Sequence, residues 1–295
     1  MDDNRKYWES SNENISIETR KILNEYLLSL KLANKAEATI TKYHWILERF
    51  FNECPIPLKI LTDEDVLQWL NDFSVDKKPK TIDLILSCLS SFFNFCLAED
   101  YLENMVIKKR WRPKIPQSLP RYLSEQDYAL VKLAAERLSL RNRALILFLF
   151  SSGCRRSEVS NLNLQDVDIE RRTAVVKGKG KKIRHVQFSE ECAIVLNEYL
   201  KTRSSVETDA LFINRQGLRL LPKGIYEIIS RFGKKIGIPL HPHCFRHTFA
   251  TNMLARGANL EFIADEMGHA NLNTTRIYAR IPTEDMMLAY QNKMG

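Results

Sequence analysis

Apolar residues recur at every third or fourth position along most of the chain, which is the spacing of amphipathic helices. In the first third of the sequence this period predicts a series of helices that begins near Ile17. The others cover Thr39 to Phe51, about Asp63 to Phe73 behind a Thr62 cap, and Thr81 to Leu97. The pattern predicts a small all-helical domain over residues 17–105, preceded by a flexible polar N-terminus over residues 1–16.

The helical pattern breaks over residues 106–121, where Pro113, Pro116 and Pro120 interrupt any helix. We interpret this segment as a semi-extended linker between two domains. It contains no acidic residue, and its cations could follow a DNA backbone, although an ordinary solvated linker is the alternative. These cations are Lys108, Lys109, Arg110, Arg112, Lys114 and Arg121.

A second domain is predicted beyond the linker, over residues 122–295. Two helices run from Ser124 to beyond Glu158, and the period then changes from helical to alternating. Thr173 to Lys177 and Ile183 to Phe188 are β-type runs joined by a short turn rich in glycine and lysine. We therefore expect a hairpin or a three-stranded meander with a basic tip.

Helix-terminating residues divide the last part of the chain. Pro242 and Gly257 bracket one helix, and Asn259 and Gly268 bracket a second. Asn273 or Thr274 can begin a third helix, which carries Tyr278. The whole pattern predicts a mainly α protein with a small antiparallel β-sheet, built from a helical N-terminal domain and a mixed α/β C-terminal domain.

Composition adds limits on location and partners. The longest apolar run, Ala144 to Phe150, is too short to cross a bilayer, and no apolar signal segment follows Met1, so we expect a cytoplasmic protein without membrane contact. The six cysteines form neither a CxxC pair nor a Cys/His cluster, so we expect reduced thiols, no metal and no cofactor. The formal net charge of +8 suggests a polyanionic partner.

Several polar residues lie at the ends of predicted elements, where their side chains could converge on one cleft. His243 and Arg246 are three residues apart on one predicted helix, so a single phosphate oxygen could contact both. The full set is Arg155, Lys179, His243, Arg246, His269 and Tyr278.

The segments that hold these residues resemble the tyrosine recombinase, or phage integrase, family, in an order and spacing similar to those of Xer-type recombinases. They read SGCRRSE (152–158), GKG (178–180), HCFRH (243–247) and GH followed by Tyr278. The resemblance implies a SAM-like core-binding domain followed by a catalytic domain. It also implies site-specific cleavage and rejoining of DNA without ATP or metal, in integration, dimer resolution or cointegrate resolution. Cys154 and Arg156 replace the leucine and the aliphatic residue that the family often has there.

The resemblance also implies a role for each residue. Tyr278 would attack a DNA phosphodiester and form a 3'-phosphotyrosyl bond, with His243 as the candidate base. A phenol with a pKa near 10 is ionised only about one part in a thousand at pH 7, so its proton must leave as it attacks. Arg155, Arg246 and His269 would hold the phosphate. Lys179 would protonate the leaving 5'-oxygen, although Lys181 and Lys182 lie close by, and Glu158 would orient the site.

Several residues have competing interpretations. His241 and His247, like His44 and His185, are interpreted as ordinary structural histidines, and Tyr290 is the competing nucleophile. The cations between residues 171 and 184, Arg184 among them, face no acid within that stretch, so they could bind phosphates or form a solvated hairpin face.

Two other functions are compatible with parts of the pattern. A DNA-binding regulator would explain a helix-turn-helix pattern over residues 260–278, and a type IB topoisomerase would share the chemistry. If the chain is a recombinase, it should form a tetramer on two DNA sites. The apolar tail from Glu284 to Lys293 would then dock into a neighbouring subunit, the alternative being its own domain.

Overall fold

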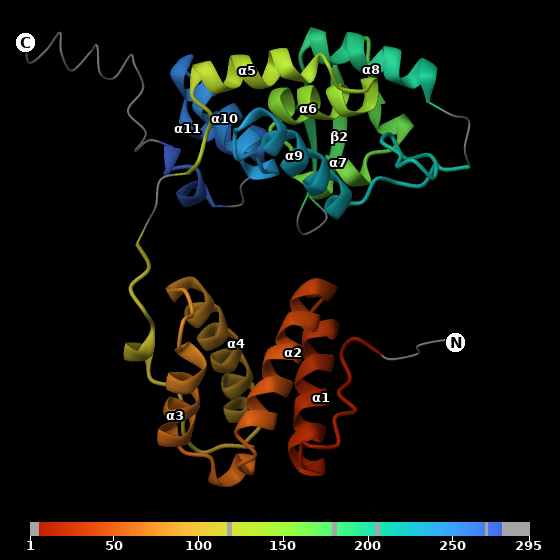
Figure 1. Cartoon of the computed structure of the whole chain (residues 1–295). Helices are drawn as coiled ribbons and strands as arrows, with labels where there is room; N and C mark the ends of the chain where they lie inside the picture. Colours follow the sequence, from red (N-terminus) through yellow and green to blue (C-terminus); the bar gives the residue numbers. More distant parts are fainter. Residues whose placement is uncertain (1–5, 117–119, 179–181, 204–206, 269–270, 279–295) are drawn as a thin grey trace, which may run out of the picture. The chain divides into compact units, whose positions relative to one another are not determined.

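The computed structural model describes residues 6–116, 120–178, 182–203, 207–268 and 271–278. The chain forms two compact units, residues 1–117 and 118–295, each with its own apolar core (Figure 1). Helices dominate both units, and the second unit also contains a small antiparallel sheet. The predicted fold class is therefore confirmed.

The first unit contains the helices that the apolar spacing predicts. Ser16 caps the first of them through the Thr19 amide, and Thr62 and Asp65 form a capping box at the start of the third, as the Thr62 cap predicts. The helices are α1 (Ile17–Leu32), α2 (Glu37–Glu53), α3 (Asp63–Ser74) and α4 (Pro79–Ala98), with 3₁₀ turns η1 (Leu58–Ile60) and η2 (Lys109–Trp111).

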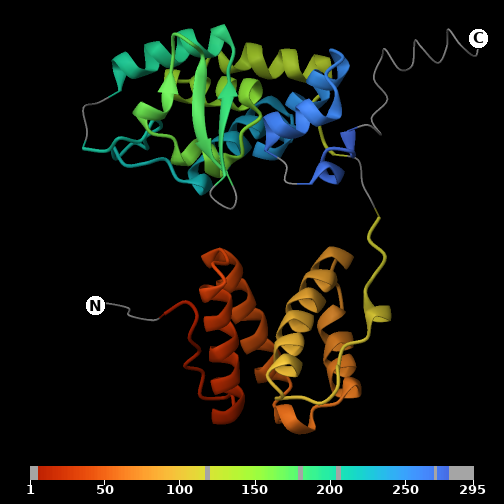
Figure 2. The ribbon, with the colours of Figure 1, turned by 180° about the vertical axis from the view of Figure 1, so that it is seen from behind.

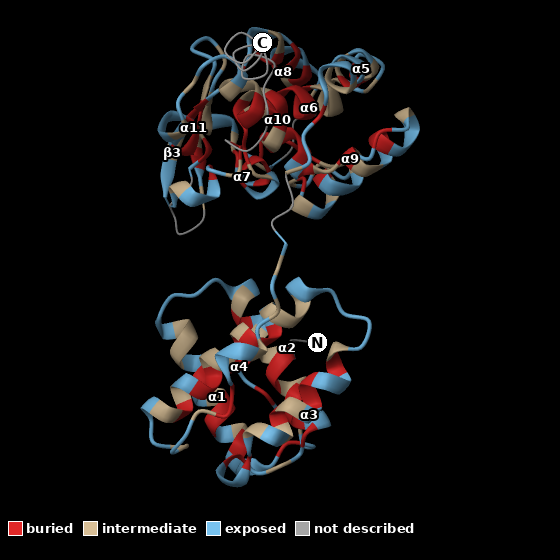
Figure 3. Ribbon diagram, turned by 90° about the vertical axis from the view of Figure 1, so that its left-hand side faces the viewer, coloured by how far each residue is buried: buried red, intermediate tan, exposed pale blue. Residues whose placement is uncertain are grey.

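Aromatic rings fill the core of the first unit. Phe50, Phe92 and Phe93 are fully buried and pack edge to face, and Trp69 stacks on Phe73. By length and composition α4 could cross a membrane. Its apolar side instead faces this core, and Figure 3 shows buried residues on the inward sides of the helices.

The packed part of the first unit extends past both of its predicted boundaries. Ser10 and Ile15 are buried ahead of α1, and Val106 and Ile107 are buried after α4. Trp111 also packs against this core. The many cations of the 106–121 segment favour a linker in the sequence pattern, but its apolar residues pack the first part of the segment against the helices.

The second unit places helices around a three-stranded meander with the order β1-β2-β3 (Figure 2). The predicted strands pair in antiparallel register, with Val175 opposite His185. The elements are α5 (Glu125–Ala135), α6 (Leu140–Ser152), α7 (Arg156–Asn161), η3 (Leu164–Asp166), β1 (Val167–Asp168), β2 (Thr173–Lys177), β3 (Ile183–Gln187), α8 (Glu190–Thr202), α9 (Pro222–Ile236), α10 (Pro242–Ala255), α11 (Leu260–Met267) and η5 (Leu272–Thr274).

The prediction of a helix that carries Tyr278 is wrong for the residues that the structure describes. A 3₁₀ turn, η5, begins after Asn271, whose side chain accepts a hydrogen bond from the Asn273 amide. The Tyr278 amide donates to the Thr275 carbonyl, three residues back, at 3.0 Å. Up to Tyr278 the chain therefore makes tight turns after α11, and the second helix of the supposed helix-turn-helix is absent from this stretch.

Gly153 ends α6 at a point where the backbone and the neighbouring helix both require glycine. Its φ is +59°, and a Cβ atom there would lie 2.4 Å from the Phe249 ring of α10. Gly237, which ends α9, has a φ of +73° but open space around it. A comparison of the two positions therefore separates the energetic cost of backbone strain from that of the steric clash with Phe249.

We expect Gly153→Ala to lower the free energy of unfolding of the second unit by roughly 2–5 kcal/mol, because left-handed strain and overpacking add. Gly237→Ala should cost only about 1–2 kcal/mol, since it adds strain alone. Urea unfolding of the full chain, followed by circular dichroism, measures both. Equal losses would show that Phe249 moves aside without cost.

Candidate active site

The four predicted catalytic residues that the structure describes line one cleft of about 740 Å³. Arg155 caps the start of α7, and His243 and Arg246 lie in the first turns of α10. Tyr278 reaches the same cleft from beyond η5. Lys182, Arg184 and Asp265 also line it, so the cations outnumber the single carboxylate among the lining residues that are described.

Glu158 is the buried anion beneath this cleft. Its side chain is only 1% exposed and accepts hydrogen bonds from the backbone amide and the guanidinium of Arg155, both at 2.7 Å. The amide bond closes the first turn of α7, and the guanidinium bond fixes the direction of the Arg155 side chain. Glu158 therefore orients Arg155, and Arg155 keeps 28% of its side chain exposed toward the cleft.

Arg184 is the second cation on Glu158, so it is neither a free phosphate ligand nor part of a solvated hairpin face. Its side chain is 12% exposed and donates to both Glu158 oxygens, at 2.9 and 3.0 Å. Its acidic partner lies outside the 171–184 stretch. The same is true of Arg171 and Arg172, which lie within 3.7 Å of Asp168 and 3.6 Å of Glu190 respectively.

Burial opposes ionisation of Glu158, but the hydrogen bonds from Arg184 and Arg155 outweigh it and hold the pKa of Glu158 below the usual carboxyl value. The carboxylate is therefore charged at neutral pH. Two guanidinium groups share this one negative charge, so a net positive charge remains at the cleft.

Arg246 is the most deeply buried cation of the site, at 4% exposure. Its terminal nitrogens donate to the carbonyls of Gly153 and Met267, which fixes the plane of the guanidinium. Burial lowers the pKa of Arg246 to about 10, which still leaves it charged at neutral pH. A guanidinium has five N–H donors, so others remain for a phosphate oxygen in the cleft.

Tyr278 is almost fully buried, at 1% exposure, in a small apolar cluster with Ala250, Ile263 and Met267. Burial raises its pKa to about 12, although the charge of Arg246 acts in the opposite direction. Its phenol oxygen lies 2.8 Å from Nδ1 of His247. The nucleophile predicted from the sequence is thus in the cleft and un-ionised at neutral pH.

His247 is the residue of this site that sequence reasoning missed. The sequence alone favours a structural role for it, yet its ring is hydrogen-bonded to the predicted nucleophile. The available signal was its position four residues after His243, which places both rings on one face of α10, with centroids 6.3 Å apart. Burial lowers the pKa of His247 to about 4, and burial also lowers the pKa of His243.

Three arginines of the site hold the C-terminal end of α11. Arg184, Arg246 and Arg155 donate to the carbonyls of three successive residues, 266 to 268, the last at 3.4 Å. These carbonyls have no partners within the helix and carry its negative dipole end. Gly268 ends the helix in the left-handed conformation.

The two departures from the family pattern fit this packing. Cys154 is buried, and its sulfur lies 3.9 Å from the Arg184 guanidinium. Arg156 is exposed and lies over the Tyr226 ring, 5.6 Å from its centroid. Neither change disturbs Arg155.

Lys179, Lys181 and His269 lie outside the described residues. Gly178 and Lys182, the nearest described residues on either side of the two lysines, both line the cleft. The Gly178 amide donates to the Lys182 carbonyl at 2.7 Å. Gly268, which precedes His269, lines the cleft as well.

Comparisons with known proteins identify the family. A model described as the phage integrase family matches residues 121–284, and a model of the phage integrase N-terminal SAM-like domain matches residues 22–113. The chain belongs to the phage integrase family. It is an enzyme of the tyrosine recombinase type, as the motifs imply, and the regulator and topoisomerase alternatives are not favoured.

Relatives cover nearly the whole recombinase. The tyrosine recombinase XerA of Pyrococcus horikoshii is 34% identical over 279 residues, which is 92% of each chain. The tyrosine recombinase XerC of Thermodesulfovibrio yellowstonii is 31% identical over 294 residues, 92% of this chain and 95% of that protein. The fold resembles a crystal structure of XerH site-specific recombinase bound to palindromic difH substrate, with a TM-score of 0.75 and 21% identity over 96% of this chain and 90% of that one.

The linker cations of the recombinase differ in their surroundings. Lys108 pairs with Asp63, and Arg112 contacts Asp83 at 2.7 Å, so these two are not unopposed as the charge pattern suggested. The others are exposed and have no carboxylate within ion-pair distance in the part of the chain that is described. They are Lys109, Arg110, Lys114 and Arg121.

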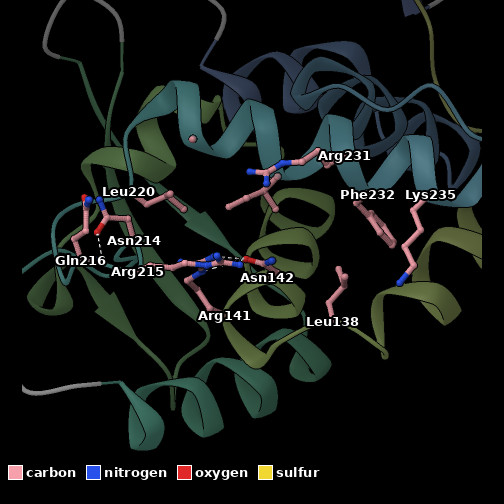
Figure 4. A pocket seen from close by; sticks show the side chains of 12 residues that line it. Leu138, Arg141, Asn142, Asn214, Arg215, Gln216, Leu220, Arg231, Phe232 and Lys235 are labelled. Atoms are coloured by element: carbon pink, nitrogen blue, oxygen red, sulfur yellow. Dashed lines mark hydrogen bonds between the residues drawn. The ribbon is translucent and has the colours of Figure 1, made fainter.

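A second cavity, of about 500 Å³, lies between α6, α9 and the loop before α9 (Figure 4). It shares no lining residue with the cleft. Its walls combine apolar Leu220 and Phe232 with several cations, of which Arg141 donates to the Ile213 carbonyl at 2.9 Å. None of the predicted site residues lines it.

We expect Arg184→Met to lower the free energy of unfolding of the recombinase by about 3–5 kcal/mol, because it removes the main partner of a buried carboxylate. Adding Glu158→Gln should recover part of that loss, since the buried carboxylate that has lost its main partner is then removed as well. Lys177→Gln, an exposed change at the end of β2, should stay within about 0.5 kcal/mol of the unchanged protein. Urea unfolding of the four proteins tests the scheme.

The pH dependence of these unfolding curves has a defined sign. The folded-state pKa of Glu158 lies below its unfolded value, so its stabilisation is present at neutral pH and is lost as the pH falls through the carboxyl range. Arg184→Met should make this loss of stability less steep. Without the hydrogen bonds from Arg184, burial raises the folded-state pKa of Glu158 toward or above its unfolded value. A variant that loses stability on acidification as steeply as the unchanged protein would contradict the pairing.

Proposed function

We propose that this site-specific recombinase cuts a DNA strand when the Tyr278 oxygen attacks a backbone phosphorus. The attack forms a 3'-phosphotyrosyl bond and releases a 5'-hydroxyl. The observation that carries the proposal is one cleft lined by the phenol of Tyr278 and by the guanidinium groups of Arg155 and Arg246. A single phosphate in this cleft can meet the nucleophile and both cations.

The arginines would stabilise the charge that builds up on the nonbridging oxygens. Arg155 and Arg246 stay charged and are held from behind, by Glu158 and by backbone carbonyls, so they need not reorganise during the reaction. Loss of one such donor typically costs about a hundredfold to a thousandfold in rate.

The remaining roles follow the family resemblance. His243 is the candidate base, His269 adds a hydrogen bond to the phosphate, and Lys179 protonates the leaving 5'-oxygen. The phosphotyrosyl ester keeps the energy of the broken bond, so a 5'-hydroxyl from another strand can reseal it without ATP.

The first unit would act as the core-binding domain, and the second as the catalytic domain. The exposed linker cations Lys109, Arg110, Lys114 and Arg121, with Lys181 and Lys182 of the hairpin, would contact DNA phosphates. Lys108 and Arg112 would contribute less, since acidic residues already neutralise them.

The proposed site of action is the cytoplasm. All six cysteines are buried and free, as expected for a reducing compartment. The proposed substrate is duplex DNA with two recombination sites, on which the enzyme assembles as a tetramer. Integration, dimer resolution and cointegrate resolution all use this chemistry.

Covalent trapping tests the nucleophile. The recombinase is incubated with genomic fragments, denatured, and the DNA that stays attached is sequenced. A nicked duplex of the recovered site should then bind the enzyme covalently through its 3' end. Tyr278→Phe should abolish attachment, whereas Tyr290→Phe should leave it unchanged.

The outcomes separate the competing functions. Attachment by Tyr278→Phe would move the nucleophile elsewhere, and no attachment by the unchanged protein would favour a regulator. Relaxation of supercoiled DNA without exchange between two duplexes would indicate a topoisomerase.

Removal of residues 284–295 tests the proposed exchange of tails. The truncated protein should still bind a single site, because none of the residues that line the described cleft lies beyond Tyr278. It should no longer form a tetramer on two sites. Gel-shift assays and light scattering with the recovered site measure both steps. A truncated protein that still forms the tetramer would show that the tail docks on its own domain or nowhere.

A further inference from the structure

The hydrogen bond between His247 and Tyr278 has a role that the predicted catalytic set leaves unassigned. The bond measures 2.8 Å from Nδ1 to the phenol oxygen, and the two rings are 5.7 Å apart at their centroids. His247 directly follows Arg246 on α10, so one turn of helix holds both a phosphate ligand and the partner of the nucleophile.

The direction of this bond follows from burial. Tyr278 is 1% exposed, and its phenol hydrogen needs an acceptor because a buried donor without one is costly. Nδ1 of His247 is the hydrogen-bond partner of the phenol oxygen among the described residues. If Nδ1 carried a proton and donated it, the phenol hydrogen would be left without a partner there. A neutral His247 with its proton on Nε2 satisfies both groups.

His243 is not the hydrogen-bond partner of the Tyr278 phenol. It lines the cleft on the exposed face of α10, and its ring centroid is 6.3 Å from that of His247. His243 can therefore meet a bound phosphate, while the His247 ring contacts both the His243 ring and the Tyr278 ring.

We propose that His247 is a positioning residue for strand cleavage. Its Nδ1 accepts the hydrogen bond of the Tyr278 phenol and holds the attacking oxygen at the wall of the cleft that contains Arg155 and Arg246. This inference rests on the proposed function of Tyr278 as nucleophile. Orientation of this kind is worth a large factor in rate, since a misplacement of about 1 Å can cost on the order of a hundredfold.

The hydrogen bond can be tested without DNA. Nitrogen-15 NMR of the histidine rings in the full-length protein should show His247 as the Nε2–H tautomer, with an Nδ1 shift that changes in Tyr278→Phe. The ring of His241 serves as the internal reference, because it lies at the N-cap of the same helix and makes no hydrogen bond to Tyr278 within the described part of the chain. A protonated Nδ1 on His247, or no response to Tyr278→Phe, would overturn the proposal.

The catalytic effect uses the nicked duplex of the recovered site. His247→Leu, which removes the acceptor, should slow covalent attachment by about 10- to 100-fold while DNA binding stays unchanged. His247→Asn should recover much of that rate, because the asparagine oxygen can accept near the position of Nδ1 yet cannot take up a proton. His241→Leu is the matched control and should match the unchanged protein. Circular dichroism and urea unfolding confirm that each variant folds.

The results separate this inference from the proposed function. If His247→Leu attaches at the normal rate while Tyr278→Phe does not attach, the positioning role is wrong and the nucleophile stands. If asparagine is as slow as leucine, the hydrogen bond is not what His247 supplies, and the proposal also fails. If Tyr278→Phe still attaches, the proposed function itself fails, and the NMR result still decides whether the hydrogen bond exists.

Discussion

The buried carboxylate of Glu158 is the interaction on which the cleft depends. Removing such a charge from water costs several kcal/mol, which only close opposite charges and hydrogen bonds can offset. Arg155 and Arg184 supply them from α7 and β3. Because Arg184 also reaches the Glu266 carbonyl, one carboxylate links a short helix, a strand and the end of α11. The cleft lies where these elements meet.

The hydrogen-bond partners of the arginines divide them into one with a structural role and two that can bind a phosphate. Arg184 donates its hydrogen bonds to Glu158 and to the Glu266 carbonyl, so its role is to hold the elements around the cleft together. Arg246 uses two donors on carbonyls, and Arg155 is more exposed, so both keep donors for a phosphate. All three arginines donate hydrogen bonds to successive carbonyls at the end of α11. The position of the chain that leads to Tyr278 is thus set by the same cations that would bind the substrate.

Periodicity and caps predicted the helices of the first unit, and α10 and α11 of the second, to within a few residues, because amphipathic spacing is local information. They did not predict α8, and they gave two helices where the structure has α5, α6 and α7. The motifs placed Arg155, His243, Arg246 and Tyr278 in one cleft for a similar reason. The first three lie at the starts of helices, and Tyr278 follows a 3₁₀ turn. Contacts across the chain were not predictable in this way. Arg184 pairs with a residue 26 positions away, and His247 with one 31 positions away. The turn at Tyr278 was missed because the Asn271 side chain competes with helix formation.

The environment of Tyr278 constrains when its proton can leave. A cationic cleft should favour the phenolate, yet burial outweighs Arg246 and raises the pKa of Tyr278 to about 12. Its partner His247, with a pKa near 4, is a weak base in the free protein. A bound phosphate adds negative charge, which makes a separate phenolate still less favourable and makes a nearby imidazole more basic. In the proposed reaction the proton would therefore leave during the attack on phosphorus and not before it, which would tie the reactivity of Tyr278 to the presence of DNA.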